Sequence, residues 1–198
     1  MILGFHVIMT AYGFWLPNDP RGSWSDWIRR WELLRFGEAT KVTTRKSLAH
    51  HPHDHALRLA AKKALMYPPV QFTGEQAREI GAGFAEAAST AGYRLWAASI
   101  LPEHVHLIIG RHARSIQIVA AHLKGRANAH LAAAGIHPFQ DIHTPAGDRV
   151  SPWTRRFWKV FLYSPEHIIT AINYVRRNPM KEGLKEQRWY FETPYSAW

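Results

Sequence analysis

Two histidines one residue apart, in the stretch LPEHVHLIIG, are the residues whose types and spacing first suggest chemistry. Side chains alternate across a β-strand, so His104 and His106 project from the same face, with their Cα atoms about 6.6–6.8 Å apart. Two imidazoles at that spacing can converge on one divalent cation. The alternative is a pair of half-buried strand histidines that hydrogen-bond to their neighbours. The apolar residues between and after them point to the other face, into the predicted core.

A tyrosine and an amide stand one helical turn apart in the segment SPEHIITAINYVRRNPMKEGL. Tyr174 and Asn178 are four residues apart, which makes them neighbours on the surface of a helix. They flank an apolar stripe through which this helix must dock on the domain. We therefore expect both side chains to face the two histidines. The alternative is an amphipathic surface helix that happens to carry a tyrosine.

The elements that must position these residues follow from the apolar patterning. Strands are predicted over residues 2–10, 93–100, 104–110 and 156–163, and helices over 73–92 and 115–134. Ser164 begins a further helix, which is expected to end near Asn178 because Pro179 disfavours helical geometry in the residue before it. This order predicts an α+β fold: a ferredoxin-like antiparallel sheet with helices packed on one face. We assign a single domain over residues 1–198, with an insertion at 11–72, a tyrosine-bearing helix at 164–179 and a tail at 180–198.

The composition favours a nucleic-acid partner. The 25 Lys and Arg against 15 Asp and Glu give a formal net charge of +10, and nine tryptophans accompany them. Cations displace phosphate counterions, and aromatic rings stack on unpaired bases. The absence of cysteine excludes a disulfide framework, a thiolate metal site and a cysteine nucleophile. We expect a cytoplasmic protein with no membrane segment.

Two motifs together resemble a known family. LPEHVHLIIG is similar to the Met/Leu-Pro-Asp/Glu-His-Val-His-hydrophobic signature of the HUH-type single-tyrosine transposases. WTRRFWKVFL and AINYVRRNPMKEGL resemble the C-terminal signature of the REP-associated tyrosine transposase branch. The resemblance covers residues 2–10 and 73–184 and leaves out the insertion.

The resemblance implies roles for the residues that match. The metal-binding histidines of the family fall on His104 and His106, the third ligand falls on Asn178, and the nucleophile falls on Tyr174. It also implies Mg²⁺ or Mn²⁺ as cofactor and single-stranded or hairpin DNA as partner. Attack by the tyrosine would leave a 5′-phosphotyrosine and a free 3′-OH. Relatives include both monomers and homodimers that exchange the tyrosine helix, so either state is expected.

Other residues fill out this hypothesis. Basic residues expected to hold DNA are Lys124, Arg126, Arg155, Arg156, Lys159, Arg176, Arg177 and Lys181. HHPHDH, from His50 to His55, is a competing metal candidate, and Tyr163 and Tyr190 are fallback nucleophiles. Trp24, Trp27 and Trp31 recur at helical spacing, which favours a small satellite core over a base-stacking platform. The aromatic C-terminal tail packs back over the domain or touches DNA.

Two further functions remain open. The chain could be a domesticated hairpin-DNA-binding protein with little or no cleavage activity. It could also be a metal-dependent hydrolase that uses water in place of the tyrosine. The first predicts tight binding without a covalent adduct, and the second predicts cleavage that survives loss of Tyr174 but not loss of His104.

Overall fold

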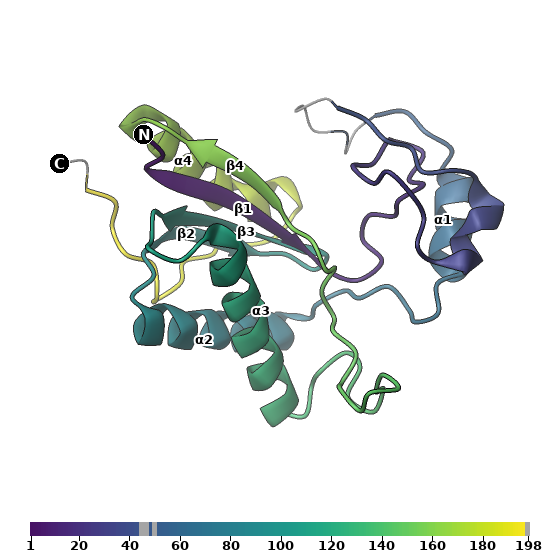
Figure 1. Cartoon of the computed structure of the whole chain (residues 1–198). Helices are drawn as coiled ribbons and strands as arrows, with labels where there is room; N and C mark the ends of the chain where they lie inside the picture. Colours follow the sequence, from purple (N-terminus) through teal and green to yellow (C-terminus); the bar gives the residue numbers. More distant parts are fainter. Residues whose placement is uncertain (44–47, 49–50, 197–198) are drawn as a thin grey trace. The chain divides into compact units, whose positions relative to one another are not determined.

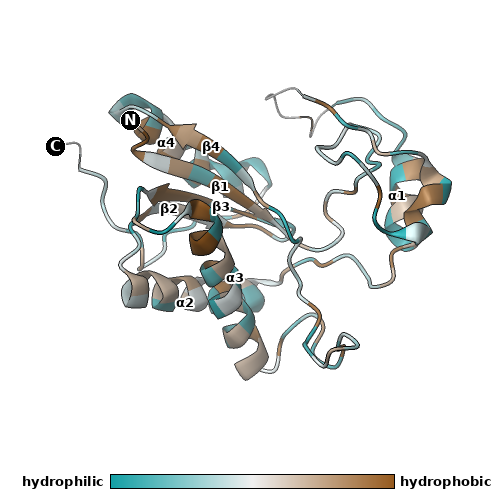
Figure 2. Cartoon of the chain, viewed as in Figure 1, coloured by the Kyte–Doolittle hydropathy of each residue, from teal (hydrophilic) through white to brown (hydrophobic). Residues whose placement is uncertain are grey.

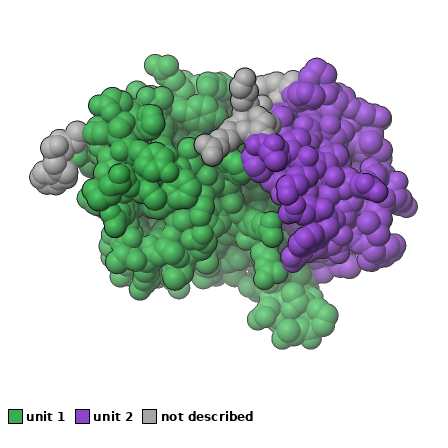
Figure 3. Space-filling view, turned by 45° about the horizontal axis from the view of Figure 1, so that its top comes forward, with its two compact units in different colours: residues 1–11, 71–198 green, residues 12–70 purple. Residues whose placement is uncertain are grey.

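The computed structural model describes residues 1–43, 48 and 51–196. The chain divides into two compact units, one of residues 1–11 and 71–198 and the other of residues 12–70 (Figure 3). The second unit falls within the range 11–72 assigned as an insertion. No helix in the described ranges has the length and apolar character needed to cross a bilayer.

The first unit is built on one antiparallel sheet with strand order β2-β3-β1-β4 (Figure 1). Its strands are β1 (Gly4–Thr10), β2 (Leu95–Ile100), β3 (His104–Gly110) and β4 (Trp158–Leu162). Helices α2 (Gly74–Ala91) and α3 (Ile116–Ala133) join β1 to β2 and β3 to β4. This β-α-β-β-α-β order confirms the α+β, ferredoxin-like prediction.

The two faces of the sheet are covered by different helices. By the alternation of side chains, the fully buried Val7 and Leu107 point away from the face that carries the two histidines of β3. Helices α2 and α3 cover one face (Figure 1). The opposite face is covered by α4 (Pro165–Lys181), whose Ile168, Ile172 and Val175 pack in one core cluster with residues of β2, β3 and β4. β2 is buried along its whole length and is brown in Figure 2. Since side chains alternate, α4 shares its face with the two histidines of β3.

The end of α4 differs from the prediction. The helix continues through Pro179 to Lys181 instead of ending near Asn178. Pro179 stands in the last turn, where its missing N–H removes one hydrogen bond without stopping the helix. Gly183, with φ of 73°, and Leu184 close the helix by donating their N–H groups to the carbonyls of Met180 and Pro179, at 3.1 and 2.9 Å. This is a Schellman stop, and it keeps Asn178 inside the helix.

The C-terminal tail covers the outer edge of β2. The Gln187 side chain accepts a hydrogen bond from the N–H of Ile100 and donates one to its carbonyl, both at 2.8 Å. The Glu192 carboxylate accepts from the N–H of Ala98 at 3.0 Å. An open strand edge offers unpaired backbone groups that invite wrong pairing. The tail therefore packs on the domain and satisfies that edge.

We expect Gln187→Ala to lower the free energy of unfolding by about 1–3 kcal/mol, because it leaves the N–H and carbonyl of Ile100 without their side-chain partner. Urea unfolding followed by circular dichroism measures the difference. Glu186→Ala is the matched control, because Glu186 pairs with the exposed Arg188 and its removal should change stability little. Equal losses in the two variants would show that the edge contact does not stabilise the fold.

The second unit contains one α-helix, α1 (His55–Lys63), and one 3₁₀ helix, η1 (Trp31–Phe36), in its described part. Its small core is formed by Leu16, Leu33 and Ala61. The helix and satellite core predicted from the tryptophan spacing are wrong. Arg30 has extended backbone angles, so no helix runs through it, and the tryptophans on either side of it are exposed.

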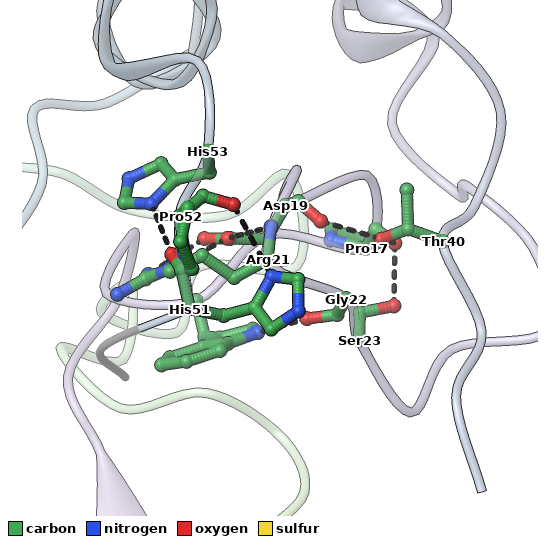
Figure 4. A network of polar contacts seen from close by, with 10 residues as sticks. Pro17, Asp19, Arg21, Gly22, Ser23, Thr40, His51, Pro52 and His53 are labelled. Carbon is green, nitrogen blue, oxygen red and sulfur yellow. Dashed lines mark hydrogen bonds and ion pairs between the residues drawn. The ribbon is translucent and has the colours of Figure 1, made fainter. Parts of the chain in front are cut away.

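A buried ion pair organises the loop that begins this unit. Arg21 donates through Nε and Nη2 to the two oxygens of Asp19, both at 2.8 Å, and its guanidinium stacks on Trp15 at 3.8 Å (Figure 4). Thr40 donates to the Asp19 carbonyl at 2.6 Å. Bidentate pairs of this kind fix geometry as well as charge. The network therefore holds the LPNDPRGSW turn in place.

Candidate active site

The two histidines of β3 lie on the same face, with ring centroids 4.9 Å apart. His106 stands opposite Ile8 of β1 on one side and Ser99 of β2 on the other, at the centre of the sheet. Its side chain is buried, whereas His104 lies at the beginning of the strand, opposite Thr10. The rigid strand therefore presents both rings toward the layer that holds α4.

A third histidine, which the sequence analysis did not single out, completes this group. His6 of β1 lies on the same face, and its Nε2 is 2.9 Å from Nδ1 of His106, within hydrogen-bond distance. The sequence does show that His6, Ile8 and Thr10 share one face of the strand GFHVIMT, because side chains alternate along a strand. The pairing of β1 with β3 that brings His6 to His106 is a long-range register, which no local pattern reveals.

Tyr174 approaches this group from α4 in the same chain. Its ring centroid is 5.7 Å from that of His106 and 5.7 Å from that of His6. The Lys181 ammonium lies 4.7 Å from the centre of the tyrosine ring. The side chain is 42% exposed, so its ring contacts the histidines while part of it remains open to solvent. Tyr174 thus lies beside His106, 68 residues earlier in the sequence, and beside His6, 168 residues earlier, within one chain.

Two further polar residues belong to α4 and to the position just after it. Asn178 is buried on the same side of the helix as Val175. Glu182, just after the helix, has a carboxylate oxygen 3.7 Å from Nε2 of His104. The structure thus places Asn178 on the helix face that packs on the sheet, and it adds a carboxylate that the sequence analysis did not include.

Burial controls the charge of these groups. It lowers the pKa of His6 and of His104 to about 4, and the Glu103 carboxylate opposes the shift at His104 only in part. Burial, with smaller contributions from His104 and His6, also holds the pKa of His106 well below its usual value. All three imidazoles are therefore neutral near pH 7, with lone pairs available to a cation or a hydrogen bond. Burial and then the Glu182 charge raise the pKa of Tyr174, so its phenol is protonated.

These pKa shifts predict that the metal-free protein loses stability in acid. A histidine with a folded pKa of about 4 and an unfolded value of 6.5 binds its proton mainly in the unfolded state between those two values. Stability is therefore complete above about pH 6.5 and falls by up to about 1.4 kcal/mol per pH unit for each such histidine as the pH drops toward 4. Urea unfolding in EDTA at pH 7, 6 and 5 tests this. His6→Phe should give a shallower pH dependence, and equal stability at pH 5 and 7 would contradict the prediction.

The donor types fit a divalent cation with open coordination positions. Within the described ranges, no three His, Asp or Glu side chains form a group that could hold a metal by themselves. If the Asn178 amide joined them, His104 and His106 would supply two neutral imidazoles beside one amide oxygen, which would leave room for phosphate and water oxygens. Mg²⁺ and Mn²⁺ are commonly bound in this way, through few protein ligands and the phosphates of the substrate.

His6 is placed to fix the tautomer of His106. If His6 accepts through Nε2, the proton of His106 stands on Nδ1 and its Nε2 is left available as a ligand.

We expect His6→Phe, which keeps a ring and removes the acceptor, to weaken Mn²⁺ binding about 10- to 100-fold. Titration of Mn²⁺ by electron paramagnetic resonance measures the loss. His6→Gln should restore part of the affinity, and His112→Phe, two residues beyond the end of β3, should have no effect. Equal affinity in His6→Phe and wild type would exclude this role.

Three of the predicted DNA-binding cations make contacts inside the first unit. The Lys124 ammonium donates to the carbonyls of Thr154 and Arg156, the Arg126 guanidinium pairs with Glu86, and Arg176 pairs with Glu192. Burial lowers the pKa of Lys124 to about 8. Lys124 and Arg126 also belong to α3, on the face of the sheet opposite the histidines. These side chains are therefore engaged in holding the fold.

The remaining predicted cations are more open. Arg155, Arg156, Arg177 and Lys181 are exposed. Lys159 lies over the Phe161 ring at 5.4 Å. Arg177 and Lys181 belong to the helix that carries Tyr174, so a phosphate backbone that reaches the tyrosine passes close to them.

The competing candidates have other surroundings. In HHPHDH, His50 lies outside the described residues. His53 bonds to the carbonyl of His51 at 2.8 Å, and Asp54 caps α1 by accepting from the Leu57 N–H at 2.9 Å. The described part of this motif does not form a metal-holding group. The fallback tyrosines, Tyr163 and Tyr190, contact phenylalanine rings instead of the histidines.

Two solved structures are similar to this chain. One is a REP-associated tyrosine transposase bound to a REP hairpin, with a TM-score of 0.47, 13% sequence identity, and coverage of 92% of this chain and 70% of that one. The other is a putative transposase from Deinococcus radiodurans R1, with a TM-score of 0.43, 15% identity, and coverage of 88% and 89%. No family model matches the chain, and no curated protein matches it. At this level of similarity, function has to be inferred from the residues of the site.

Proposed function

We propose that this protein is a transposase-type enzyme that cleaves and rejoins single-stranded DNA, including strands next to hairpins, through a covalent bond to Tyr174. The observation that supports this most strongly is the position of the Tyr174 ring, 5.7 Å from the rings of both His106 and His6 in one chain. A single phenol beside a group of neutral imidazoles suits nucleophilic attack on a phosphodiester.

In the proposed reaction, the Tyr174 oxygen forms a bond to the phosphorus while the bond to the 3′ oxygen breaks. The products are a 5′-phosphotyrosine and a strand with a 3′-OH. The phenol loses its proton during the attack and the departing 3′ oxygen gains one, so protons balance. Because the phosphotyrosine keeps the ester bond, attack by another 3′-OH reverses the step and joins two strands without a nucleotide cofactor.

The chain's own residues would hold a divalent cation, Mg²⁺ or Mn²⁺, at His104, His106 and Asn178. When bound, such an ion neutralises charge that grows on the phosphate oxygens in the transition state. The position of His104 and His106 on a central strand keeps the two rings at a fixed separation. The Lys181 ammonium, 4.7 Å from the centre of the Tyr174 ring, favours the phenolate as it develops.

The strand would be held by the exposed cations Arg155, Arg156, Arg177 and Lys181, of which the last two share α4 with Tyr174. Since Tyr174 and the histidines meet in one protomer, a monomer has the residues required for cleavage. A homodimer that exchanges α4 is the alternative arrangement, and mixing a Tyr174→Phe chain with a His106→Ala chain separates the two. Only an exchanged dimer would regain activity in the mixture.

The direct test incubates the protein with end-labelled hairpin DNA that carries unpaired flanks, together with Mn²⁺. We expect a labelled adduct that survives denaturing gel electrophoresis and maps to Tyr174 by mass spectrometry. Tight binding without an adduct or cleavage would indicate the hairpin-binding protein. Cleavage without any adduct would indicate the water-dependent hydrolase.

A further inference from the structure

The second unit presents an aromatic and basic surface that the proposed reaction does not use. We propose that the tryptophan surface, defined here as Trp24, Trp27 and Trp31 with Arg29 and Arg35, is a separate binding site for unpaired bases of single-stranded DNA. The argument concerns this unit alone and does not depend on the chemistry of Tyr174.

The three tryptophans are exposed at positions where a small core would be expected to bury them. Trp24, Trp27 and Trp31 are 42%, 57% and 78% exposed. The core of this unit is formed instead by Leu16, Leu33 and Ala61, so the indole rings are not needed to fill it. Three large apolar side chains left exposed within one stretch of eight residues are available for a binding partner.

A cavity adjoins the most exposed of these rings. It has a volume of about 480 Å³ and a mainly apolar lining of Trp31, Glu32, Leu34, Arg35, Ala64 and Met66. This size falls within the usual range for small-molecule sites. We expect a planar base to stack against the Trp31 indole, with Arg35, which also lines the cavity, beside its phosphate.

Glu32 places in this cavity a carboxylate to which no group of the described residues donates a hydrogen bond. The side chain is only 9% exposed, and neither carboxylate oxygen accepts a hydrogen bond from the part of the chain that the structure describes. Its ion pair with Arg30 is long, at 3.8 Å. A buried carboxylate is costly without a donor. The amino group of a cytosine is a donor that carboxylates read in nucleic-acid complexes, so this residue would favour bases with an exocyclic amine.

Charge selects a nucleic-acid occupant over an apolar peptide. Residues 12–70 contain ten Lys and Arg against five Asp and Glu. Arg29 lies 5.6 Å from the centre of the Trp27 ring, so cation and aromatic ring are already side by side. Interleaved cations and exposed rings suit a single strand, since in a duplex the faces of the bases are stacked on one another.

The test uses the full-length protein and a fluorescein-labelled oligo-dC of about 12 nucleotides, a length within the usual span of one single-strand site. We expect the double variant Trp27→Ala with Trp31→Ala to bind at least about 10-fold more weakly in fluorescence anisotropy, because each stacked base contributes about 1–3 kcal/mol. Leu59→Ala removes an exposed apolar side chain of the same unit outside the surface and should leave affinity unchanged. Glu32→Gln should reduce the preference for oligo-dC over oligo-dT.

Photo-crosslinking with an oligonucleotide that contains 5-iododeoxyuridine locates the contact. We expect crosslinked peptides from residues 24–35 in the wild type and their loss in the double variant. Crosslinks confined to the first unit, with unchanged affinity of the double variant, would overturn the proposal. So would a concentration-dependent dimer, seen by sedimentation, that only Trp31→Ala abolishes, because the surface would then bind a second copy of the chain.

The test of the tryptophan surface can fail or succeed independently of the test of the Tyr174 reaction. Covalent adduct formation at saturating hairpin DNA should persist in the tryptophan double variant, whose unchanged melting temperature would show that it folds. Binding that depends on the tryptophans in a protein that forms no adduct would support this surface and exclude the proposed reaction. The reverse pattern would support the reaction alone.

Discussion

Tyr174→Phe is expected to abolish the covalent DNA adduct and to lower strand cleavage by a factor on the order of 10⁴ or more, as is typical when a nucleophile is removed. The substitution removes one oxygen and keeps the ring that lies 5.7 Å from the rings of His6 and His106. It should therefore leave the fold and DNA binding unchanged. Denaturing electrophoresis of labelled hairpin DNA after incubation with Mn²⁺ measures both adduct and cleavage.

Tyr163→Phe and Tyr190→Phe are matched controls, because both side chains are exposed and both rings contact phenylalanine instead of the histidines. Each should retain full adduct formation. An adduct that persists in Tyr174→Phe and disappears in one of the controls would move the nucleophile to that residue. Cleavage that persists in Tyr174→Phe without an adduct would replace the tyrosine with water.

Removal of the paired histidines should have the second-largest effect. We expect His104→Ala and His106→Ala each to lower adduct formation by a factor on the order of 10³, the usual loss when charge stabilisation of a transition state is removed. Both imidazoles are neutral near pH 7 because burial lowers their pKa, so both are available as ligands. Titration with Mn²⁺ should show the loss of binding directly, apart from catalysis.

The control for these variants is His112→Ala, which removes a histidine just beyond the other end of β3. His106 is buried, so the melting temperature of His106→Ala must be compared with that of the wild type. His104 is at the beginning of the strand and gives the cleaner test. Full adduct formation in a folded His104→Ala protein would remove the metal from the proposed mechanism.

Local patterns predicted those parts of the site that depend on periodicity. Alternation along β3 placed His104 and His106 on one face, and the four-residue spacing placed Tyr174 and Asn178 on one helix. The order of elements gave the ferredoxin-like sheet. Each of these features is determined within a few neighbouring residues or by the rules that connect successive elements.

The features that were missed depend on contacts between distant segments. His6 joins the site only through the register of β1 against β3, and Glu182 approaches His104 only because α4 extends past Pro179. The tryptophans of the second unit follow a helical spacing, yet extended angles at Arg30 interrupt the helix and leave them exposed. In such places, tertiary contacts override the local preference of the sequence for a helix.

The contacts of Glu192 restrict the movement of the helix that carries Tyr174. One oxygen of this carboxylate accepts from the backbone of Ala98, and the other is 3.4 Å from the guanidinium of Arg176, two residues after Tyr174. Through Glu192, the C-terminal tail therefore links α4 to strand β2. Any movement of α4 away from β2 must therefore break the contact between Arg176 and Glu192, or the contact between Glu192 and Ala98.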